Sequence, residues 1–491
     1  MPVISNGPSS AASERSGARP SLRRGEPVGG SDGSSIRFSA AATLERYRAA
    51  IGSRCWLWQT WAVPTTTEDL RARGLVHQVT DEALFERLDA GGLTVYAGFD
   101  PTADSLHIGH LLQLCTLRRL QLAGHRPIAL AGGGTGMIGD PGGKSAERPL
   151  LSVEEIRSNV ESIRGQLARF LDFDDAAGPT RALLLDNADW LSPLTVLEFL
   201  RDVGKNFTVN QMVAKESVRS RLERPDQGIT YTEFSYMLLQ AYDFARLNED
   251  HGCTLQIGGS DQWGNITMGI ELVHRRSGDK AYGLTSPLVT KADGTKFGKS
   301  ESGNDRVWLD AGRTSPYRLY QFFLGVEDAM VGTYLRYFTY LDLDEITELD
   351  QATEQRPHER AAQRALAAAV VSLVHGESEC ARAQEASAAL FSGRVATLDE
   401  ATLLDVASEV PASTLAAARV ADGVLLVDLL AETGLVASKG EARRAIEQNG
   451  AFVNDEVRPG LDALVTGDDL LHGRYVVLRR GKRSYHLVTV A

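Results

Sequence analysis

Apolar positions along the chain follow two alternating patterns from about residue 67 onward. Segments with helical periodicity, such as Val153–Leu171 and Thr232–Leu247, alternate with short apolar runs bounded by glycine. These runs predict strands at Thr94–Phe99, Pro127–Ala131, Ala182–Leu185, Thr254–Ile257 and Pro287–Val289. Strands that alternate with helices predict an α/β domain with a parallel, doubly wound sheet.

The pattern changes along the chain and divides it into five segments. Residues 1–66 have no sustained periodicity and are rich in Ser, Gly, Ala and Arg, so we expect disorder. The α/β pattern covers residues 67–310, and residues 311–405 carry little strand signal and many helix-forming residues. Residues 406–421 are interpreted as a linker. The remaining residues, 422–491, predict two short helices followed by strands, which form a small α+β domain.

Two explanations compete for the N-terminal segment. Its Arg and Ser content with few acids is typical of an organelle transit peptide, whereas an upstream start codon would make it an artefact. The next methionine after Met1 is Met137, so a shorter start needs a non-Met codon, and Val63 is a candidate. A peptide spanning Arg54 to Arg71 in mass spectrometry would exclude the late start. We expect a cytoplasmic protein, or an organelle protein if the segment is a transit peptide.

Composition indicates an ordinary globular protein, with 43% hydrophobic and 24% charged residues. No run of about 18 apolar residues occurs, so no membrane span is expected. The net charge of -12 argues against a nucleic-acid partner, but basic residues are grouped locally near the C-terminus. The four cysteines are far apart and match no zinc or disulfide spacing, so we expect a reducing setting and no zinc.

A turn-rich loop, Asp100–Ser105, follows the first strand of the α/β domain. We expect the next helix to begin near Leu106 with Ser105 as its N-cap. A helix N-terminus at this edge of a sheet attracts phosphate, and His107 and His110 share one face of its first turn. Gly109 leaves the backbone open to an adenine ring. A zinc half-site is the alternative, but no further ligands are spaced nearby.

A second segment, 290–300, is rich in glycine and lysine. Lys296 and Lys299 could reach pyrophosphate oxygens, although alone the segment is as well explained by a solvated basic loop. Together with the histidine segment it points to ATP-dependent activation of a carboxylate. An ionised carboxylate needs no general base, so a site of cations and hydrogen-bond donors suffices.

Polar residues also interrupt apolar patterns between these two segments. Tyr236, Gln240 and Asp243 lie at i, i+4 and i+7 of one helical pattern and share a face, although a solvent-facing stripe gives the same spacing. Asp140 ends a glycine-rich loop, 132–141, that lacks the glycine spacing of a dinucleotide site. We interpret this loop as a flexible wall that brings Asp140 close to a small ligand.

Three segments, Tyr96–His110, Gly258–Asn265 and Lys296–Ser300, resemble signature blocks of the bacterial-type tyrosyl-tRNA synthetases, which are class I aminoacyl-tRNA synthetases. The resemblance runs from about residue 68 to the C-terminus. It implies a Rossmann-like catalytic domain, a homodimer and a ligase that needs ATP, with Mg²⁺ accompanying the triphosphate. L-tyrosine would react with ATP to give tyrosyl-adenylate and pyrophosphate. Tyrosine would then pass to the 3′-terminal ribose of tRNA(Tyr).

The resemblance implies roles for particular side chains of this sequence. The tyrosine-binding residues would be Tyr96, Asp140, Tyr236, Gln240, Asp243 and Gln262. The residues that stabilise the reacting phosphates would be Thr102, His107, His110, Lys296 and Lys299. Further ATP contacts would come from Gly98, Asp100, Gly109, Gly259, Asp261, Lys299 and Ser300. No residue is expected to bind a resident metal.

Residues 422–491 resemble the small RNA-binding domain first known from a ribosomal small-subunit protein. The implied phosphate contacts are Lys439, Arg443, Arg444, Lys482 and Arg483. A solvated charged surface is the alternative interpretation. Two rival functions share parts of the pattern. A tryptophan-specific synthetase is disfavoured by Tyr96 with Asp243, and a non-catalytic RNA-binding relative is disfavoured by the retained site residues.

Overall fold

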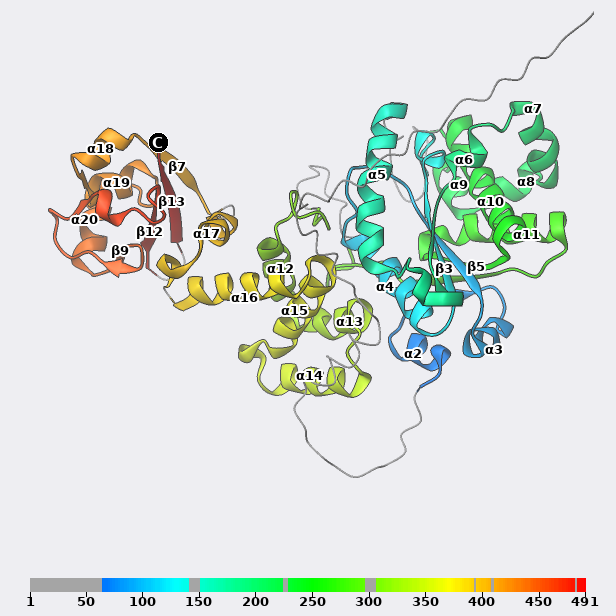
Figure 1. The fold of residues 1–491 in the computed structure, drawn as a ribbon, viewed down its shortest axis with the longest axis horizontal. Coiled ribbons are helices and arrows are strands. Elements are labelled where there is room, and N and C mark those ends of the chain that lie inside the picture. The colour runs from blue at the N-terminus through cyan, green and yellow to red at the C-terminus, as the bar shows by residue number, and fades with distance from the viewer. Residues whose placement is uncertain are drawn as a thin grey trace, which may run out of the picture. The chain divides into compact units, whose positions relative to one another are not determined.

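A six-stranded sheet forms the centre of the α/β domain, and Figure 1 shows it between helices. Its strands, in spatial order, are β1 (Gln78–Val79), β6 (Tyr282–Ser286), β5 (Cys253–Gly259), β2 (Thr94–Phe99), β3 (Arg126–Ala131) and β4 (Leu183–Asp186). Only β1 runs antiparallel to its neighbour, and the other four pairings are parallel. The computed structural model describes residues 64–140, 151–223, 228–295, 306–392, 394–407, 410–481 and 484–491. The predicted extension at 1–66 lies outside them apart from its last three residues.

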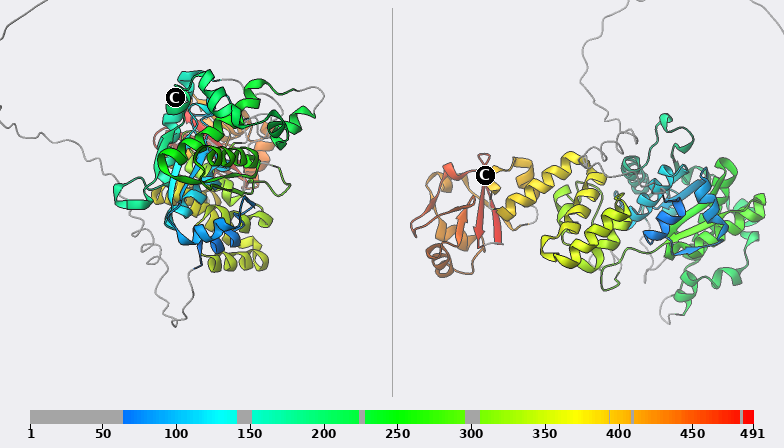
Figure 2. Two further views of the ribbon diagram at one scale, coloured as in Figure 1. Left: turned by 90° about the vertical axis from the view of Figure 1, so that its right-hand side faces the viewer. Right: turned by 90° about the horizontal axis from the view of Figure 1, so that it is seen from below.

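Helices cover both faces of this sheet, which confirms the doubly wound prediction (Figures 1 and 2). Tyr96 and Ile128 face a cluster with Phe244 and Met268 of two long helices, whereas Val95 faces the opposite cluster. This alternation follows from the two-residue period of a strand. The α-helices of this domain are α2 (Thr66–Ala72), α3 (Ala83–Ala90), α4 (Ile108–Leu122), α5 (Val153–Phe170), α6 (Ala188–Leu191), α7 (Val196–Glu198), α8 (Val209–Val213), α9 (Glu216–Leu222), α10 (Tyr231–His251) and α11 (Trp263–Ser277). Short 3₁₀ or π turns lie at η1 (Thr135–Met137), η2 (Asp175–Thr180), η3 (Phe199–Val203), η4 (Gly204–Asn206) and η5 (Ser260–Gln262).

The fifth predicted strand was misplaced. Residues 287–289 are not a strand, and β6 lies just before them at Tyr282–Ser286. Pro287 has no N–H for a sheet ladder, which explains why the strand ends there. β6 is buried throughout but contains Gly283, because a Cβ there would lie 2.3 Å from Ile266 Cγ2 of α11. Without a run of large apolar residues, its sequence carried little strand signal.

The predicted start of α4 was also wrong by two residues. The helix begins at Ile108 with His107 as its N-cap, and the His107 Nδ1 atom accepts a hydrogen bond from Gly109 N at 3.0 Å. The Ser105 hydroxyl is engaged elsewhere, because it donates to Leu106 O at 2.7 Å and accepts from Asp310 N at 3.1 Å. His107 itself keeps extended backbone geometry, and the helix begins after it.

The described residues of the predicted helical segment form six α-helices and two 3₁₀ turns. These are α12 (Pro316–Leu324), α13 (Asp328–Phe338), α14 (Leu343–Gln355), η6 (Pro357–Glu359), α15 (Ala361–His375), α16 (Glu377–Ser392), η7 (Val395–Thr397) and α17 (Glu400–Ala407). Phe323, Phe338 and Leu366 are fully buried and belong to the same apolar core as Leu111 of α4. This shared core fixes the helical segment against the helix that carries His107 and His110.

The C-terminal residues form an α+β domain with an apolar core of its own, while Tyr475, Val477 and Leu487 belong to the core of the helical segment. A five-stranded sheet has the order β10 (Glu456–Val457), β9 (Ala451–Val453), β12 (Tyr475–Arg480), β13 (Ser484–Val490) and β7 (Ala412–Leu415). The remaining elements are α18 (Ala417–Ala421), the pair β8 (Val424–Leu425) and β11 (Leu464–Val465), α19 (Leu426–Glu432), α20 (Lys439–Glu447) and η8 (Gly467–Asp469). The expected linker 406–421 differs from this structure, because β7 and α18 lie within it and β7 pairs in parallel with β13. A four-residue strand is too short to show a period in the sequence.

Candidate active site

Asp243 on α10 lies in a buried hydrogen-bonded setting at the carboxyl edge of the sheet. Its Oδ2 accepts from Asn187 Nδ2 at 2.9 Å, and its Oδ1 accepts from Trp190 Nε1 at 2.7 Å. Burial raises the pKa of Asp243 to about 7, although both hydrogen bonds act to lower it. Asn187 and Trp190 were not predicted, since they lie in or beside the four-residue α6, where no periodicity marks them.

Tyr96 of β2 lies near this carboxylate. The side chain is 1% exposed, and its hydroxyl has no hydrogen-bond partner among the described residues. Its ring packs edge-on to Phe244, with 5.1 Å between ring centroids. Burial, and then the negative charge of Asp243, hold the pKa of Tyr96 well above its usual value. The tyrosine is therefore a neutral hydroxyl that can both donate and accept.

A second polar cluster connects the loop after β2 with α10 and the glycine-rich loop. Tyr236 donates its hydroxyl to Asp100 Oδ2 at 2.8 Å, and Thr135 donates to Asp100 Oδ1 at 2.8 Å. Burial, followed by the charges of Asp100 and Asp140, raises the pKa of Tyr236 well above its usual value. Asp100 and Asp140 bring negative charge to this cluster, which suits the binding of an ammonium group.

Glutamine side chains connect Asp140 to the same helix. Gln262 donates to Asp140 Oδ2 at 2.6 Å, and Gln240 donates to Gln262 Oε1 at 3.1 Å. Asn265 Nδ2 in turn donates to Gln240 Oε1 at 3.0 Å. The structure therefore brings the six predicted tyrosine-binding residues to one edge of the sheet. Five of them belong to hydrogen-bonded groups, and Tyr96 lies near Asp243 without a hydrogen-bond partner among the described residues.

The glycine-rich loop approaches these side chains so closely that larger residues would clash. A Cβ on Gly132 would lie 2.2 Å from Asp100 Oδ1, and one on Gly133 would lie 2.3 Å from Asp186 Oδ1. The backbone N–H of Gly134 donates to Asn187 Oδ1 at 2.7 Å. The loop thus orients Asn187, and its glycines allow this close approach.

His107 and His110 stack on each other at the start of α4, with ring centroids 4.0 Å apart. His110 Nδ1 accepts from the His107 backbone N–H at 3.1 Å. A Cβ on Gly109 would lie 2.8 Å from the His107 ring, so a larger residue there would displace that ring. Both rings are partly exposed, as a contact with phosphate requires.

The segment that follows residues 296–305 pairs with this helix start. Ile108 N donates to Val307 O at 3.1 Å, and Leu309 N donates to Leu106 O at 2.8 Å. Before the gap, Tyr334 OH donates to Thr290 O at 2.7 Å. Lys296, Lys299 and Ser300 themselves lie outside the described residues. Their neighbours on the C-terminal side nevertheless run directly beside His107.

The other predicted ATP contacts lie at the same edge. Thr102 and Gly98 are exposed, and a Cβ on Gly98 would meet no atom within 4 Å. Asp261 is exposed in η5, and its carboxylate is 2.9 Å from the position of a Cβ on Gly259. These groups surround an open surface next to the buried tyrosine-binding groups.

In the C-terminal domain, three of the five predicted RNA contacts can be placed. Lys439, Arg443 and Arg444 are exposed on α20, where Lys439 pairs with Asp428 at 2.9 Å. Lys482 and Arg483 lie outside the described residues. Arg479 of β12 packs within the domain, with its guanidinium 3.5 Å from the Phe452 ring centroid.

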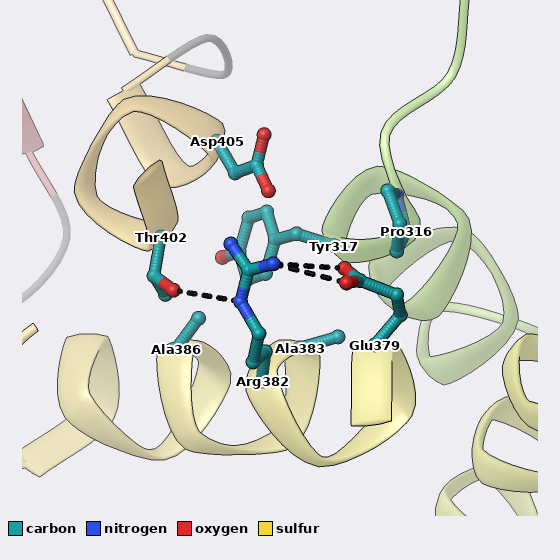
Figure 3. A pocket seen from close by; sticks show the side chains of 8 residues that line it. All are labelled: Pro316, Tyr317, Glu379, Arg382, Ala383, Ala386, Thr402 and Asp405. Carbon is teal, nitrogen blue, oxygen red and sulfur yellow. Dashed lines mark hydrogen bonds and ion pairs between the residues drawn. The ribbon is translucent and has the colours of Figure 1, made fainter. Parts of the chain in front are cut away.

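A small pocket between α12, α16 and α17 contains none of the predicted residues (Figure 3). Arg382 donates from Nη1 to both carboxylate oxygens of Glu379, at 3.0 and 3.2 Å, and its Nε lies 3.4 Å from Thr402 Oγ1. The arginine is thus engaged by side chains of α16 and α17. Within the described ranges, no group of three or more His, Cys, Asp or Glu residues could hold a metal ion, and no helix is long and apolar enough to cross a membrane.

Comparison with known proteins identifies the family. The family model described as tRNA synthetases class I (W and Y) matches residues 89–392, and that of the tyrosine–tRNA ligase SYY-like C-terminal domain matches residues 403–488. The tyrosine–tRNA ligase of Roseiflexus castenholzii is 56% identical over 425 residues, which cover 86% of this chain and 99% of that protein. This chain belongs to the tyrosine–tRNA ligase family.

Other relatives agree with this assignment. The tyrosine–tRNA ligase of Opitutus terrae is 53% identical over 428 residues, covering 87% of this chain and 100% of that protein. A C-terminally truncated mitochondrial tyrosyl-tRNA synthetase of Aspergillus nidulans has a TM-score of 0.60 and 33% identity, covering 67% of this chain and 94% of that chain. The match of the ligase C-terminal domain begins at residue 403, so it includes the segment that was expected to be a linker.

Proposed function

We propose that this member of the tyrosine–tRNA ligase family activates L-tyrosine with ATP and transfers it to tRNA(Tyr). The observation that carries the proposal is the buried Tyr96 hydroxyl, which has no partner among the described residues and lies near the Asp243 carboxylate. A buried hydroxyl without a partner costs about 1–3 kcal/mol, so the pair is suited to a ligand that brings its own hydroxyl. A phenol supplies one donor for Asp243 and one acceptor for Tyr96.

The opposite end of the substrate fits the second cluster. Its ammonium group would be held by Asp140, Tyr236 and Gln240, with Asp100 adding negative charge. This arrangement leaves the substrate carboxylate facing His107 and His110 on the open side. The two clusters therefore select both the ring substituent and the amino-acid backbone.

The chemical step needs positioning and charge stabilisation. The tyrosine carboxylate would attack the α-phosphorus of ATP, the bond to pyrophosphate would break, and no proton would have to move. Thr102, His107, His110, Lys296 and Lys299 would stabilise the departing charge, and Asp261 with Gly259 would hold the ribose. Mg²⁺ would arrive with the triphosphate, since ATP is ordinarily bound as its magnesium complex.

The RNA partner would be held by the C-terminal domain. Lys439, Arg443 and Arg444 on α20 would contact phosphates, as would Lys482 and Arg483. Arg443 and Arg444 are exposed, which supports this role. The basic grouping is local and so is compatible with the net charge of -12.

We also propose that the chain forms a homodimer through an apolar surface on α7, η3 and α8. This surface is defined by Val196, Leu197, Leu200 and Val209, whose exposed fractions are 73%, 79%, 48% and 62%. Clustered exposed apolar side chains mark interaction sites. In a symmetric dimer the same surface of a second copy would cover these side chains.

An ATP–pyrophosphate exchange assay tests the proposed activation. The purified chain should catalyse exchange of pyrophosphate into ATP when tyrosine is present and not when tryptophan replaces it. Exchange that depends on tryptophan would support the tryptophan-specific alternative. No exchange in the presence of either amino acid would support a non-catalytic RNA-binding protein. The nature of residues 1–66 and the compartment of the protein stay predictions that this assay does not address.

A further inference from the structure

Two side chains of α5 hold the two ends of the loop between β2 and α4. Asn159 Nδ2 donates to Pro101 O at 3.0 Å, and Gln166 Oε1 accepts from Leu106 N at 2.9 Å. The two residues are seven apart, so they lie on the same face of α5, two turns from each other. The loop they hold contains Thr102, and it ends directly before His107.

Gln166 also lies at a junction of three chain segments. Its Oε1 is 3.4 Å from the Ser105 hydroxyl, which accepts from Asp310 N at 3.1 Å. Leu309 N donates to Leu106 O at 2.8 Å, so the segment 307–310 is tied to the same loop. One glutamine oxygen thus connects α5, the loop before α4 and the segment that lies beside His107.

Packing alone does not explain a glutamine at this position. Gln166 is 6% exposed and Ser105 is 4% exposed, in a face of α5 that otherwise buries Ile163, Leu167 and Phe170. Burying an amide in place of an apolar side chain is unfavourable unless its hydrogen bonds are made. Its carbonyl oxygen is used at Leu106 N, the last backbone donor before the histidine segment.

We propose that Gln166, assisted by Asn159, is a positioning residue for the ATP half of the site. It fixes where His107 and His110 lie relative to the tyrosine-binding groups, and it contacts no substrate itself. The proposal rests on the proposed function, since it concerns the adenylate-forming step. A misplacement of about 1 Å can cost roughly 10²-fold in rate, so loss of this support should affect catalysis strongly.

The test is Gln166→Met, which keeps the side-chain length and removes the acceptor. We expect the maximal rate of tyrosine-dependent pyrophosphate exchange to fall at least about tenfold or the KM for ATP to rise as much. The dissociation constant for tyrosine, measured without ATP, should stay within about twofold, because the tyrosine-binding groups lie on β2, α10, η5 and the glycine-rich loop and not on the segments that Gln166 connects. Gln166→Glu should recover most of the activity, since either protonation state of its carboxyl keeps an acceptor oxygen.

Gln121 provides a matched control on α4. It is 4% exposed, accepts from Asp172 N at 2.9 Å and donates to Asp172 O at 2.8 Å, far along the helix from His107. Gln121→Met should lower the free energy of unfolding. It should not change the exchange rate or the KM for ATP relative to the dissociation constant for tyrosine. If Gln166→Met fails to fold, Asn159→Leu, at a half-buried position, is expected to show the same separation more weakly.

Wild-type exchange activity distinguishes a failure of the proposed function from a failure of the positioning role of Gln166. If the wild-type chain shows no tyrosine-dependent exchange of pyrophosphate into ATP, the proposed function fails. If the wild type is active and Gln166→Met matches it, the positioning role is overturned. The role is also overturned if Gln166→Met weakens tyrosine binding and exchange by the same factor, as a general structural defect would.

Discussion

The Asn187 side-chain amide donates to Asp243 Oδ2 at 2.9 Å, and its own carbonyl oxygen accepts from Gly134 N at 2.7 Å. One amide therefore connects the glycine-rich loop after β3 to the carboxylate on α10. Because the amide orientation is fixed by the backbone, Asp243 receives a donor in a set direction. The position of the carboxylate depends on a residue 56 positions away in the sequence.

Tyrosine affinity should depend on pH near neutrality. The pKa of Asp243 is raised to about 7, and the ionised carboxylate is the stronger acceptor for a phenol O–H. The fraction ionised grows as pH rises, so the dissociation constant for tyrosine should fall between pH 6 and pH 8 and then level off. Equilibrium binding without ATP measures this. Asp243→Asn should show no such titration, and a flat wild-type profile would contradict the assignment.

Removing the Asn187 donor should shift that titration. The Asn187 hydrogen bond lowers the pKa of Asp243, so in Asn187→Ala the pKa should rise and the midpoint of tyrosine binding should move above pH 7. Trp190→Phe should have the same sign, since Trp190 Nε1 also donates to this carboxylate. A midpoint that moves to lower pH in either variant would disagree with the geometry.

Tyr96→Phe should separate stability from function. The hydroxyl has no partner among the described residues, so its removal should leave the free energy of unfolding unchanged or raise it by about 1 kcal/mol. Tyrosine binding should weaken by about tenfold, because one phenol hydrogen bond is lost. Urea denaturation and equilibrium binding measure the two quantities. A large loss of stability would mean that the hydroxyl is paired in the free protein.

The sequence predicted the parts of this site that lie on long periodic elements. Tyr236, Gln240 and Asp243 lie on the 21-residue α10, so their shared face followed from the helix period. Tyr96 lies in a six-residue strand that the apolar pattern predicted, but its place near Asp243 was implied only by the family resemblance. Asn187 and Trp190 could not be found in this way. They lie in or beside a four-residue helix and act through contacts with Asp243 across 56 and 53 residues.

The misplaced boundaries have similarly local causes. The N-cap at His107 depends on Ser105 being engaged by Asp310, which is 205 residues away. β7 is four residues long and owes its place to pairing with β13 near the opposite end of the domain. Contacts of this range leave no periodic trace in either segment, so only the three-dimensional structure shows them.

A buried ion pair near the start of α10 should be important for stability. Arg221 and Glu233 pair through two N–H···O contacts, at 3.2 and 2.9 Å, with both side chains 5% exposed. Arg221→Met leaves a buried carboxylate unpaired, so the free energy of unfolding should fall by about 3–5 kcal/mol. Arg219→Met removes an exposed ion pair on α9, the helix that also carries Arg221. It should lower the free energy of unfolding by less than about 1 kcal/mol. Equal effects in a denaturation series would refute the distinction.

The proposed dimer surface can be tested by charge. Leu197→Glu places a carboxylate at a side chain that is 79% exposed, so the subunit itself should fold normally while the dimer dissociates. Sedimentation velocity over a range of concentrations should show a shift toward monomer. Leu404→Glu, at an exposed position on α17, is the matched control and should leave the mass unchanged. A wild-type chain that is monomeric at all concentrations would overturn the dimer.

The central claim is that Tyr96 and Asp243 form a buried pair that selects the phenol of tyrosine. The most direct measurement compares tyrosine with phenylalanine in pyrophosphate exchange, for the wild type and for Asp243→Ala. A site built to hydrogen-bond a hydroxyl discriminates by about 10⁴–10⁵-fold, a magnitude taken from this enzyme class itself. We predict discrimination of this order in the wild type and a collapse of tyrosine activation in Asp243→Ala. Near-normal tyrosine exchange by Asp243→Ala would contradict the account.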